Sequence, residues 1–324
     1  MLCSHKATII HAKLFSVTYH DTYKVVDILD AAGAKTASYL LNSCGTALPD
    51  TVDVNDYDAT VSIPLTSIAA TSTSALPFFE LLGVRTAIHK VTAPVTSLSS
   101  PCLVKAVEDG TLEAGTWEAN TISEDNFNVE VTFGNSPGAN LTDVDSFFVP
   151  FNEWQEPDIL GQQEYIKLAS VFFNKEASAN ALFADSAARL TCVQHNIQEH
   201  LRFKDEVLDK KVLWATYSDW YGGWGLGQCV PCPTCIGGSG PYYCEAAGII
   251  GVEFNPDHPT FDSNTGPTYL NHTAFAKYAT AFDADVLMYP DSNLATILAD
   301  TENFGYLADL KAVKNRQVSE GRRK

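Results

Sequence analysis

Aromatic side chains are concentrated in one short segment of this sequence. Three of the five tryptophans fall within residues 214–224. The first part of the segment has the composition of a strand, and the loop after it carries Trp220, Tyr221 and Trp224. Ligands of α/β proteins bind at the carboxyl ends of strands, where aromatic rings offer broad apolar contact and indole or hydroxyl donors. We expect these three rings to contact a ligand, although such rings also fill protein cores, as we expect of Trp214 within the strand.

Two further groups of side chains could take part in binding. Tyr242 and Tyr243 follow a loop rich in glycine, proline and cysteine, and they are second choices for the same aromatic surface. Residues 71–74 (TSTS) lie between a predicted strand and a predicted helix, where hydroxyls and free N–H groups suit a polar or anionic ligand group. Ordinary helix capping explains the same hydroxyls equally well.

A run of cysteines lies between these aromatic groups. Cys229, Cys232 and Cys235 are each three residues apart, and Cys244 follows. Such spacing occurs in zinc and iron–sulfur sites and in redox-active pairs, but no second pair or histidine completes a tetrahedral site at a usual spacing. The surrounding prolines and glycines indicate a loop, and we favour disulfide bonds that hold it in place. A metal site and a reactive Cys-x-x-Cys pair stay open as alternatives.

The sequence lacks the motifs by which common enzyme classes are recognised. It contains no G-x-S-x-G, G-x-x-x-x-G-K-[ST], H-E-x-x-H or G-x-G-x-x-G pattern. The eight histidines are scattered, and His195 and His200 are too far apart around a helix to share one metal. We predict a protein that is not an enzyme, with no catalytic residue, no metal site and no cofactor.

Composition limits the cellular context. The net charge is −18, which argues against nucleic acid as a partner because that binding depends on cationic contacts to phosphate. No run of 18 apolar residues predicts a membrane-spanning helix. Eight cysteines against two methionines favour an oxidising compartment, and Asn140 and Asn271 lie in glycosylation sequons. The first residues do not form a convincing signal peptide and we expect both ends to be truncated, so the expected location, extracellular or at the cell surface, rests on these features.

The hydrophobic pattern predicts an α/β protein. Residues 14–48 have the composition of paired strands. Residues 67–91 form a parallel strand–helix–strand unit, with Pro77 in the first helical turn and Gly83 at its end. One long helix is predicted at about 162–190, or roughly 40 Å at 1.5 Å per residue. Further strands and helices are expected at 128–133, 146–151, 211–217, 275–282, 283–289, 293–299 and 305–313.

Several segments resemble the class III periplasmic binding proteins, a family that captures cobalamin, ferric siderophores or haem for ABC transporters. Residues 63–91 (IPLTSIAATSTSALPFFELLGVRTAIHKV) resemble the family's first strand–helix–strand unit. Residues 156–176 (EPDILGQQEYIKLASVFFNKE) are similar to the start of its spine helix, and 211–215 and 283–290 are similar to strands of its C-terminal lobe. Together these segments cover most of residues 58–318.

The aromatic segments add a narrower resemblance. Residues 220–224 (WYGGW) and 242–245 (YYCE) look closest to algal, diatom-type members, which include ferrichrome-binding and cobalamin-acquisition surface proteins.

The resemblance implies two Rossmann-like α/β lobes joined by a long rigid spine helix. Its implied divisions are an N-terminal β-hairpin extension at 1–57, an N-terminal lobe at 58–157, the spine at 158–202 and a C-terminal lobe at 203–324. By position, Thr73 and Ser74 would lie at the cleft on the N-terminal lobe. Trp220, Tyr221 and Trp224 would lie there on the C-terminal lobe.

The function that the resemblance implies is non-enzymatic. A monomer would bind a metal chelate, either a ferric siderophore or cobalamin, in the cleft between its lobes for uptake through a membrane transporter or receptor. The alternative is a redox or metal-binding protein that uses the four clustered cysteines.

Overall fold

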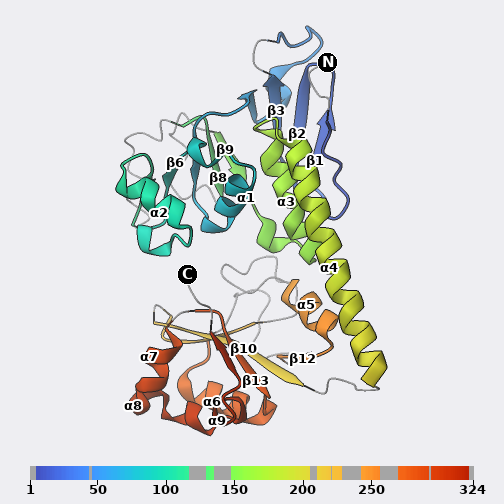
Figure 1. Cartoon of the computed structure of the whole chain (residues 1–324). Coiled ribbons are helices and arrows are strands. Elements are labelled where there is room, and N and C mark those ends of the chain that lie inside the picture. The colour runs from blue at the N-terminus through green and yellow to red at the C-terminus, as the bar shows by residue number, and fades with distance from the viewer. Residues whose placement is uncertain are drawn as a thin grey trace. The chain divides into compact units, whose positions relative to one another are not determined.

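The chain divides into two compact units in the computed structural model, and Figure 1 shows the elements of both. The first unit contains Met1–Glu153 and Leu160–Ala188, and the second contains Trp154–Ile159 and Arg189–Lys324. The structure describes residues 5–43, 46–116, 129–134, 147–204, 210–219, 221–227, 242–255, 269–291 and 293–320.

The first unit begins with a four-stranded sheet in the order β1-β2-β3-β4. Its strands are β1 (Phe15–Tyr19), β2 (Tyr23–Leu29), β3 (Lys35–Ser43) and β4 (Ala59–Ile63). The first three pair antiparallel, which confirms paired strands in 14–48 but gives three strands instead of the two of the expected hairpin. β4 joins β3 in parallel. The chain turns after β2 at Gly33, whose φ is +80°, and the Asp30 carboxylate accepts the N–H groups of Ala32 and Ala34 in the same turn.

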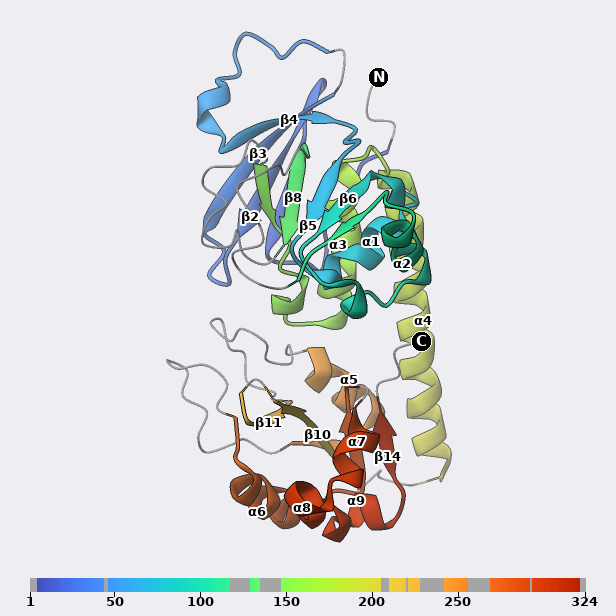
Figure 2. The ribbon, with the colours of Figure 1, turned by 90° about the vertical axis from the view of Figure 1, so that its left-hand side faces the viewer.

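The second sheet of this unit is parallel throughout, in the order β7-β6-β5-β8-β9. Figure 2 shows its central strands β6, β5 and β8 side by side. Its strands and connections are β5 (Ile68–Ala70), α1 (Leu76–Leu81), β6 (Ile88–Val91), α2 (Pro101–Glu108), β7 (Glu113–Ala114), β8 (Val131–Gly134) and β9 (Phe147–Pro150). The unit predicted at 67–91 is confirmed: Pro77 lies in the first turn of α1, and Gly83 follows the helix with φ +73°. The strands predicted at 128–133 and 146–151 correspond to β8 and β9.

Phenylalanine rings fill the core between this sheet and its helices. Phe133 of β8 is fully buried, and its ring lies 5.1 Å from Phe79 of α1 and 5.1 Å from Phe172. Phe151, just after β9, approaches the same ring at 6.2 Å. The contacts of Phe151 and Phe172 are edge-on, the geometry that ring quadrupoles favour. The carboxyl ends of β8 and β9 are therefore fixed against α1.

The long helix predicted at 162–190 is two helices, so that prediction was wrong. The helices are α3 (Ile159–Val171) and α4 (Glu176–Lys204). Between them Asn174 adopts a left-handed φ of +53°, which breaks the helical hydrogen-bond pattern. The Lys24 ammonium group of β2 reaches this break, donating to the carbonyl of Val171 at 3.1 Å and to Asn174 Oδ1 at 2.8 Å. A residue distant in sequence thus satisfies the end of α3.

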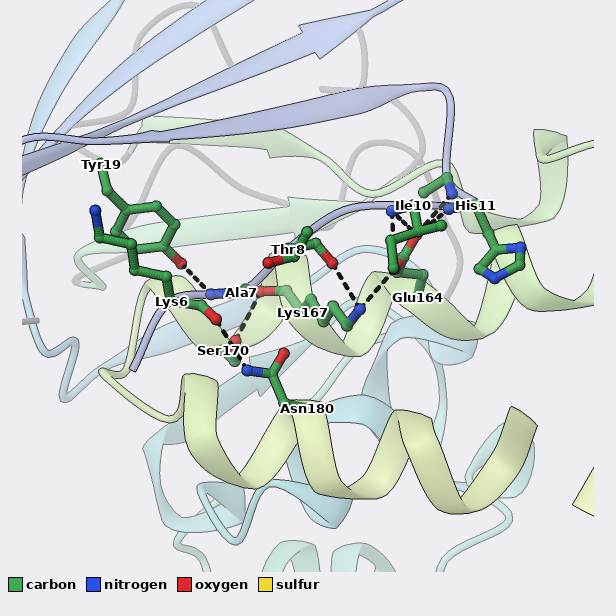
Figure 3. Close-up of polar contacts among 11 residues, drawn as sticks. Lys6, Ala7, Thr8, Ile10, His11, Tyr19, Glu164, Lys167, Ser170 and Asn180 are labelled. Atoms are coloured by element: carbon green, nitrogen blue, oxygen red, sulfur yellow. Dashed lines mark hydrogen bonds and ion pairs between the residues drawn. The ribbon is translucent and has the colours of Figure 1, made fainter. Parts of the chain in front are cut away.

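The N-terminal segment is held against α3 by a buried carboxylate. Glu164 is fully buried and accepts backbone N–H groups from three consecutive residues, Ile10, His11 and Ala12, at 2.6–3.1 Å (Figure 3). Lys167, one turn further along α3, donates to Glu164 at 2.6 Å. Successive N–H groups that converge on one anion form a nest, which stabilises buried negative charge.

The second unit is built on a five-stranded sheet. β10 (Lys211–Ser218) pairs in parallel with β12 (Glu253–Phe254) and β13 (Val286–Tyr289), and β13 pairs in parallel with β14 (Val318–Glu320). β11 (Gly223–Leu226) is antiparallel to β10. β10 and β13 confirm the strands predicted at 211–217 and 283–289, whereas no strand was predicted for β11.

Helices surround this sheet. They are α5 (Tyr242–Ile250), α6 (His272–Phe282), α7 (Leu294–Ala299), α8 (Thr301–Phe304) and α9 (Lys311–Lys314), with a 3-10 helix at Gly305–Asp309. The helices predicted at 275–282 and 293–299 are confirmed as α6 and α7. The continuous helix predicted at 305–313 is wrong, because Leu310 is extended and separates the 3-10 helix from α9. Among the described residues, no helix combines the length and apolar composition needed to cross a bilayer.

Candidate functional site

Two stacked tyrosines form an exposed aromatic surface where β10 ends. Tyr221 lies in the turn between β10 and β11 and is 57% exposed. Its ring stacks on Tyr269, with centroids 4.3 Å apart and planes inclined by 13°. Burial and the neighbouring Tyr221 raise the pKa of Tyr269, so the Tyr269 phenol is a neutral donor at physiological pH. We call Tyr221 and Tyr269 the tyrosine pair.

Glycines of β11 allow the tyrosine pair to form. A Cβ atom on Gly223 would lie 3.0 Å from the Cβ of Tyr269 and 2.9 Å from the carbonyl oxygen of Leu270. A Cβ on Gly225 would lie 3.2 Å from the Tyr269 ring. Since these two glycines lie on one face of the strand, their missing side chains leave the space that the Tyr269 ring occupies. The glycine-rich sequence here packs a ring.

Trp224 was expected on the ligand-facing surface but lies in the core. It is fully buried, and its ring stacks on Phe275 of α6 at 4.1 Å and 8°. The indole N–H donates to the Tyr306 hydroxyl at 2.7 Å. Strand alternation explains the difference, because Trp224 pairs with Tyr217 and points to the face of the sheet that α6 covers. Its ring has no exposed surface to offer a ligand.

Trp214 has a different outcome. It was expected in the core but is only partly buried, on the face of β10 opposite Leu213 and Ala215, which are buried. Its ring lies 6.1 Å from Phe254 and covers Gly227, where a Cβ would meet it at 3.0 Å. Trp214 therefore packs against its neighbours as expected but is not fully buried, whereas the prediction for Trp224 was wrong.

Around Trp224, three polar rings that sequence reasoning missed form a linked group. Tyr217 stacks on His272 at 5.3 Å, and His272 Nδ1 lies 3.1 Å from the Tyr306 hydroxyl. Burial raises the pKa of Tyr306 to about 12, although the hydrogen bond from Trp224 opposes this shift. These residues come from β10, α6 and the 3-10 helix after α8, so no single stretch of sequence could have revealed them.

Three of the other predicted contacts have little structural description. Trp220 lies outside the described residues. Tyr242 and Tyr243 begin α5, and only their backbone is described. The structure therefore brings Tyr221 together with the unpredicted Tyr269 and does not test the remaining three.

In the first unit, the predicted hydroxyl cluster caps a short helix. Ser72 precedes the 3-10 helix Thr73–Ala75, and its hydroxyl accepts the N–H of Ser74 at 3.4 Å and lies 2.7 Å from the Ser74 hydroxyl. Thr73 is partly buried and Ser74 is exposed. The capping interpretation is thus observed, and Ser74 still presents its side chain to solvent.

A buried acid that sequence reasoning missed lies beside this cluster. Glu153 is 1% exposed, and neither of its carboxyl oxygens has a hydrogen-bond partner of acceptable geometry. Burial raises the pKa of Glu153 to about 7, and the nearby Ser74 side chain opposes that shift. No motif marks this residue in the sequence, because its environment comes entirely from the tertiary fold.

The cysteine cluster is described only at its end. Cys244, in the first turn of α5, is disulfide-bonded, so it offers no thiolate to a metal in this state. Cys229, Cys232 and Cys235 lie outside the described residues, and their pairing stays a prediction. The part of the chain that the structure describes contains no group of three or more His, Cys, Asp or Glu side chains placed to hold a metal ion.

Solved structures with this architecture are numerous, although no family model matches the chain. A periplasmic binding protein from Veillonella parvula superimposes with a TM-score of 0.55 over 95% of this chain and 90% of that one, at 12% identity. The siderophore-binding protein of Bacillus subtilis complexed with ferri-bacillibactin gives 0.57 over 83% and 88%, at 16% identity. A periplasmic haem-binding protein from Pseudomonas aeruginosa gives 0.57 over 79% and 85%, also at 16% identity.

The chain has the fold of a class III periplasmic binding protein. The predicted fold class, two α/β lobes of this type, is thereby confirmed. In sequence, the chain is similar to an uncharacterized lipoprotein of Methanocaldococcus jannaschii, at 24% identity over 318 aligned residues. The match covers 92% of this chain and 69% of the relative.

Proposed function

We propose that this chain is a non-enzymatic binding protein for a metal chelate, either a ferric siderophore or cobalamin. The fold supports the proposal, because solved proteins that share it are described as binding siderophores or haem. The single observation that carries it is the tyrosine pair, a ring stack at the carboxyl end of β10 in which Tyr221 is 57% exposed.

The surface of a metal chelate is complementary to the tyrosine pair. Siderophores and cobalamin present broad, partly apolar faces with polar groups at the edge. A stacked pair of phenols offers a flat contact surface and two hydroxyl donors at low entropic cost, since each ring has only two side-chain torsions. Thr73 and Ser74 are candidate polar contacts from the first unit.

The location and partner follow from the same proposal. We propose an extracellular or cell-surface protein that delivers its ligand to an ABC transporter, in keeping with the periplasmic proteins of this fold and the lipoprotein relative. The proposal also includes a monomeric state, disulfides in the cysteine cluster and glycosylation at the two sequons. It further includes a relationship to algal, diatom-type surface proteins. Counting thiols in the native and reduced protein tests the disulfides.

Titration with chelates tests the function. Tryptophan fluorescence is measured while a ferric hydroxamate or cobalamin is added, and saturable quenching at micromolar concentration or below is expected. Tyr221→Ala should weaken binding by about tenfold, the effect expected of losing one aromatic contact of roughly 1.4 kcal/mol. Leu298→Ala is the matched control, since Leu298 is a large exposed side chain of α7 in the same unit. A folded protein that responds to no chelate would exclude the function.

A further inference from the structure

Two adjacent side chains of the first unit have buried oxygen atoms that lack hydrogen-bond partners. They are Oδ1 of Asn152 and both carboxyl oxygens of Glu153, which begins the 3-10 helix Glu153–Gln155. In the same helix the buried Nε1 of Trp154, a donor, also lacks a partner, so three unpaired acceptor atoms outnumber one unpaired donor. In folded proteins the great majority of buried polar side-chain atoms are hydrogen-bonded, because an unpaired one costs free energy. Such a concentration of unpaired acceptors indicates that something other than the protein supplies the donors.

The carboxyl group of Glu153 can be approached from the hydroxyl cluster. Ser74 is its polar neighbour and is exposed, so the Ser74 side chain is the link between this carboxyl group and solvent that the structure shows. The Ser74 hydroxyl currently contacts Ser72, at 2.7 Å. Glu153 makes no ion pair with any cation among the described residues. Apart from the Trp154 indole N–H, the unpaired buried atoms of Asn152, Glu153 and Trp154 are acceptors, and none of these side chains is a cation.

These features define the ligand group that would fit. A carboxylate, an amide oxygen and a hydroxyl all accept hydrogen bonds, so the group must donate them, and a positive charge would offset the burial of the carboxylate. The net charge of −18 also favours approach of a cation. A bare metal ion fits poorly, because hard cations require six or more oxygen ligands and the described residues contain no group of three or more His, Cys, Asp or Glu side chains placed to hold one.

We propose that Glu153, Asn152 and Ser74 form a subsite for a protonated primary amine carried by the chelate. This subsite rests on the proposed function, because it assigns one group of the ligand to the first unit. It narrows the expected ligand from metal chelates in general to those that bear an ammonium group.

A pair of chelates that differ only at the amine tests this subsite. Ferrioxamine B carries a free ammonium group, and N-acetyl ferrioxamine B carries a neutral amide at the same position. The full-length protein is titrated with each by tryptophan fluorescence at pH 7.5. Wild type should bind the ammonium form at least about tenfold more tightly, the effect of one charge-assisted hydrogen bond.

Two variants connect the preference to the subsite. Glu153→Gln has nearly the same shape and should reduce the preference to twofold or less. Ser74→Ala, at an exposed position that does not threaten folding, should reduce it about threefold. Glu80→Gln on α1 is the control, because the Glu80 carboxylate already accepts a hydrogen bond from Ser100 at 2.9 Å, and this variant should keep the wild-type preference.

The outcomes separate the subsite from the function. If wild type binds both chelates equally, or if Glu153→Gln keeps the preference, the subsite is refuted while chelate binding stands. If wild type binds neither, chelate binding fails for ferric hydroxamates and the subsite fails with it. A preference that disappears in Glu153→Gln and persists in Glu80→Gln supports both.

Discussion

The ammonium group of Lys24, on β2, lies 2.5 Å from the carboxylate of Glu176, the first residue of α4, and both side chains are almost completely buried. The same ammonium group also donates to the last carbonyl of α3. One lysine thus joins the first sheet to the end of one helix and the start of the next. Because desolvated charges are costly when unpaired, this contact is expected to matter for stability far more than a surface ion pair would.

Lys24→Met should lower the free energy of unfolding by about 3–5 kcal/mol, because it leaves the Glu176 carboxylate buried without its partner. The measurement is urea unfolding at pH 7. Lys35→Met is the control: Lys35 pairs with Asp27 but is half-exposed, so its loss should cost less than about 1 kcal/mol. Equal effects of the two substitutions would contradict the prediction.

Trp224→Ala should destabilise the protein by about 3–5 kcal/mol, since it removes a fully buried ring that stacks on Phe275. Tyr221→Ala should cost less than about 1 kcal/mol, because that ring is mostly exposed. Thermal and urea unfolding of both variants provide the comparison. A larger loss of stability in Tyr221→Ala than in Trp224→Ala would contradict the assignment of Trp224 to the core and Tyr221 to the surface.

Glu153 should make stability depend on pH in an unusual direction. Its folded pKa of about 7 lies above the ordinary value of 4.5. Below pH 4.5 the carboxyl group is protonated in both states and has no effect. Between pH 4.5 and 7 the unfolded chain ionises while the folded protein keeps the proton, so stability falls as pH rises, by on the order of 2–3 kcal/mol, and the loss is complete above pH 7.

The matching experiment compares wild type with Glu153→Gln across this range. Between pH 4.5 and 8 the unfolding free energy of wild type should fall relative to that of Glu153→Gln, by on the order of 2–3 kcal/mol. A difference that stays constant with pH would show that Glu153 titrates normally in the folded protein.

Glu164→Gln should release the N-terminal segment, because a neutral amide accepts the N–H groups of Ile10, His11 and Ala12 more weakly. Burial favours the neutral acid, but the bonds from Lys167 and these amides outweigh it and lower the pKa of Glu164. The contribution of Glu164 is therefore present at neutral pH and lost on acidification through that lowered pKa.

Hydrogen exchange measures this release directly. The amides of residues 10–12 should exchange at least about tenfold faster in Glu164→Gln than in wild type, while the amides of β2 stay protected. Unchanged protection of residues 10–12 would mean that other contacts hold the segment.

The parts of the fold that local chemistry determines could be predicted from the sequence. Pro77 and Gly83 define the start and end of α1, and the apolar strands on either side fix a parallel pair. The break at Asn174 was missed because the apolar spacing of α3 continues across it, and what stabilises the break is Lys24, some 150 residues earlier.

The candidate site was harder to predict, since its residues meet only in the tertiary structure. Trp224 and Tyr221 lie three residues apart, and their burial differs because α6 covers one face of β11. The alternate glycines at 223 and 225 were the available signal: with period two, they indicate a strand face against which another residue packs closely. The sequence around Glu153 contains no motif that predicts its burial. The carboxyl group is unusual because the folded protein buries it without a hydrogen-bond partner, and this depends on tertiary structure.

Among the described cysteines, Cys102 and Cys192 are free and exposed, and one belongs to each compact unit. The described part of the chain therefore offers two free thiols as natural attachment points for spectroscopic labels. A donor dye and an acceptor dye on these thiols would report the separation of the two units by energy transfer, with and without ferrioxamine B, without any engineered residue. Whether the protein closes on a captured molecule can thus be measured in solution, one molecule at a time.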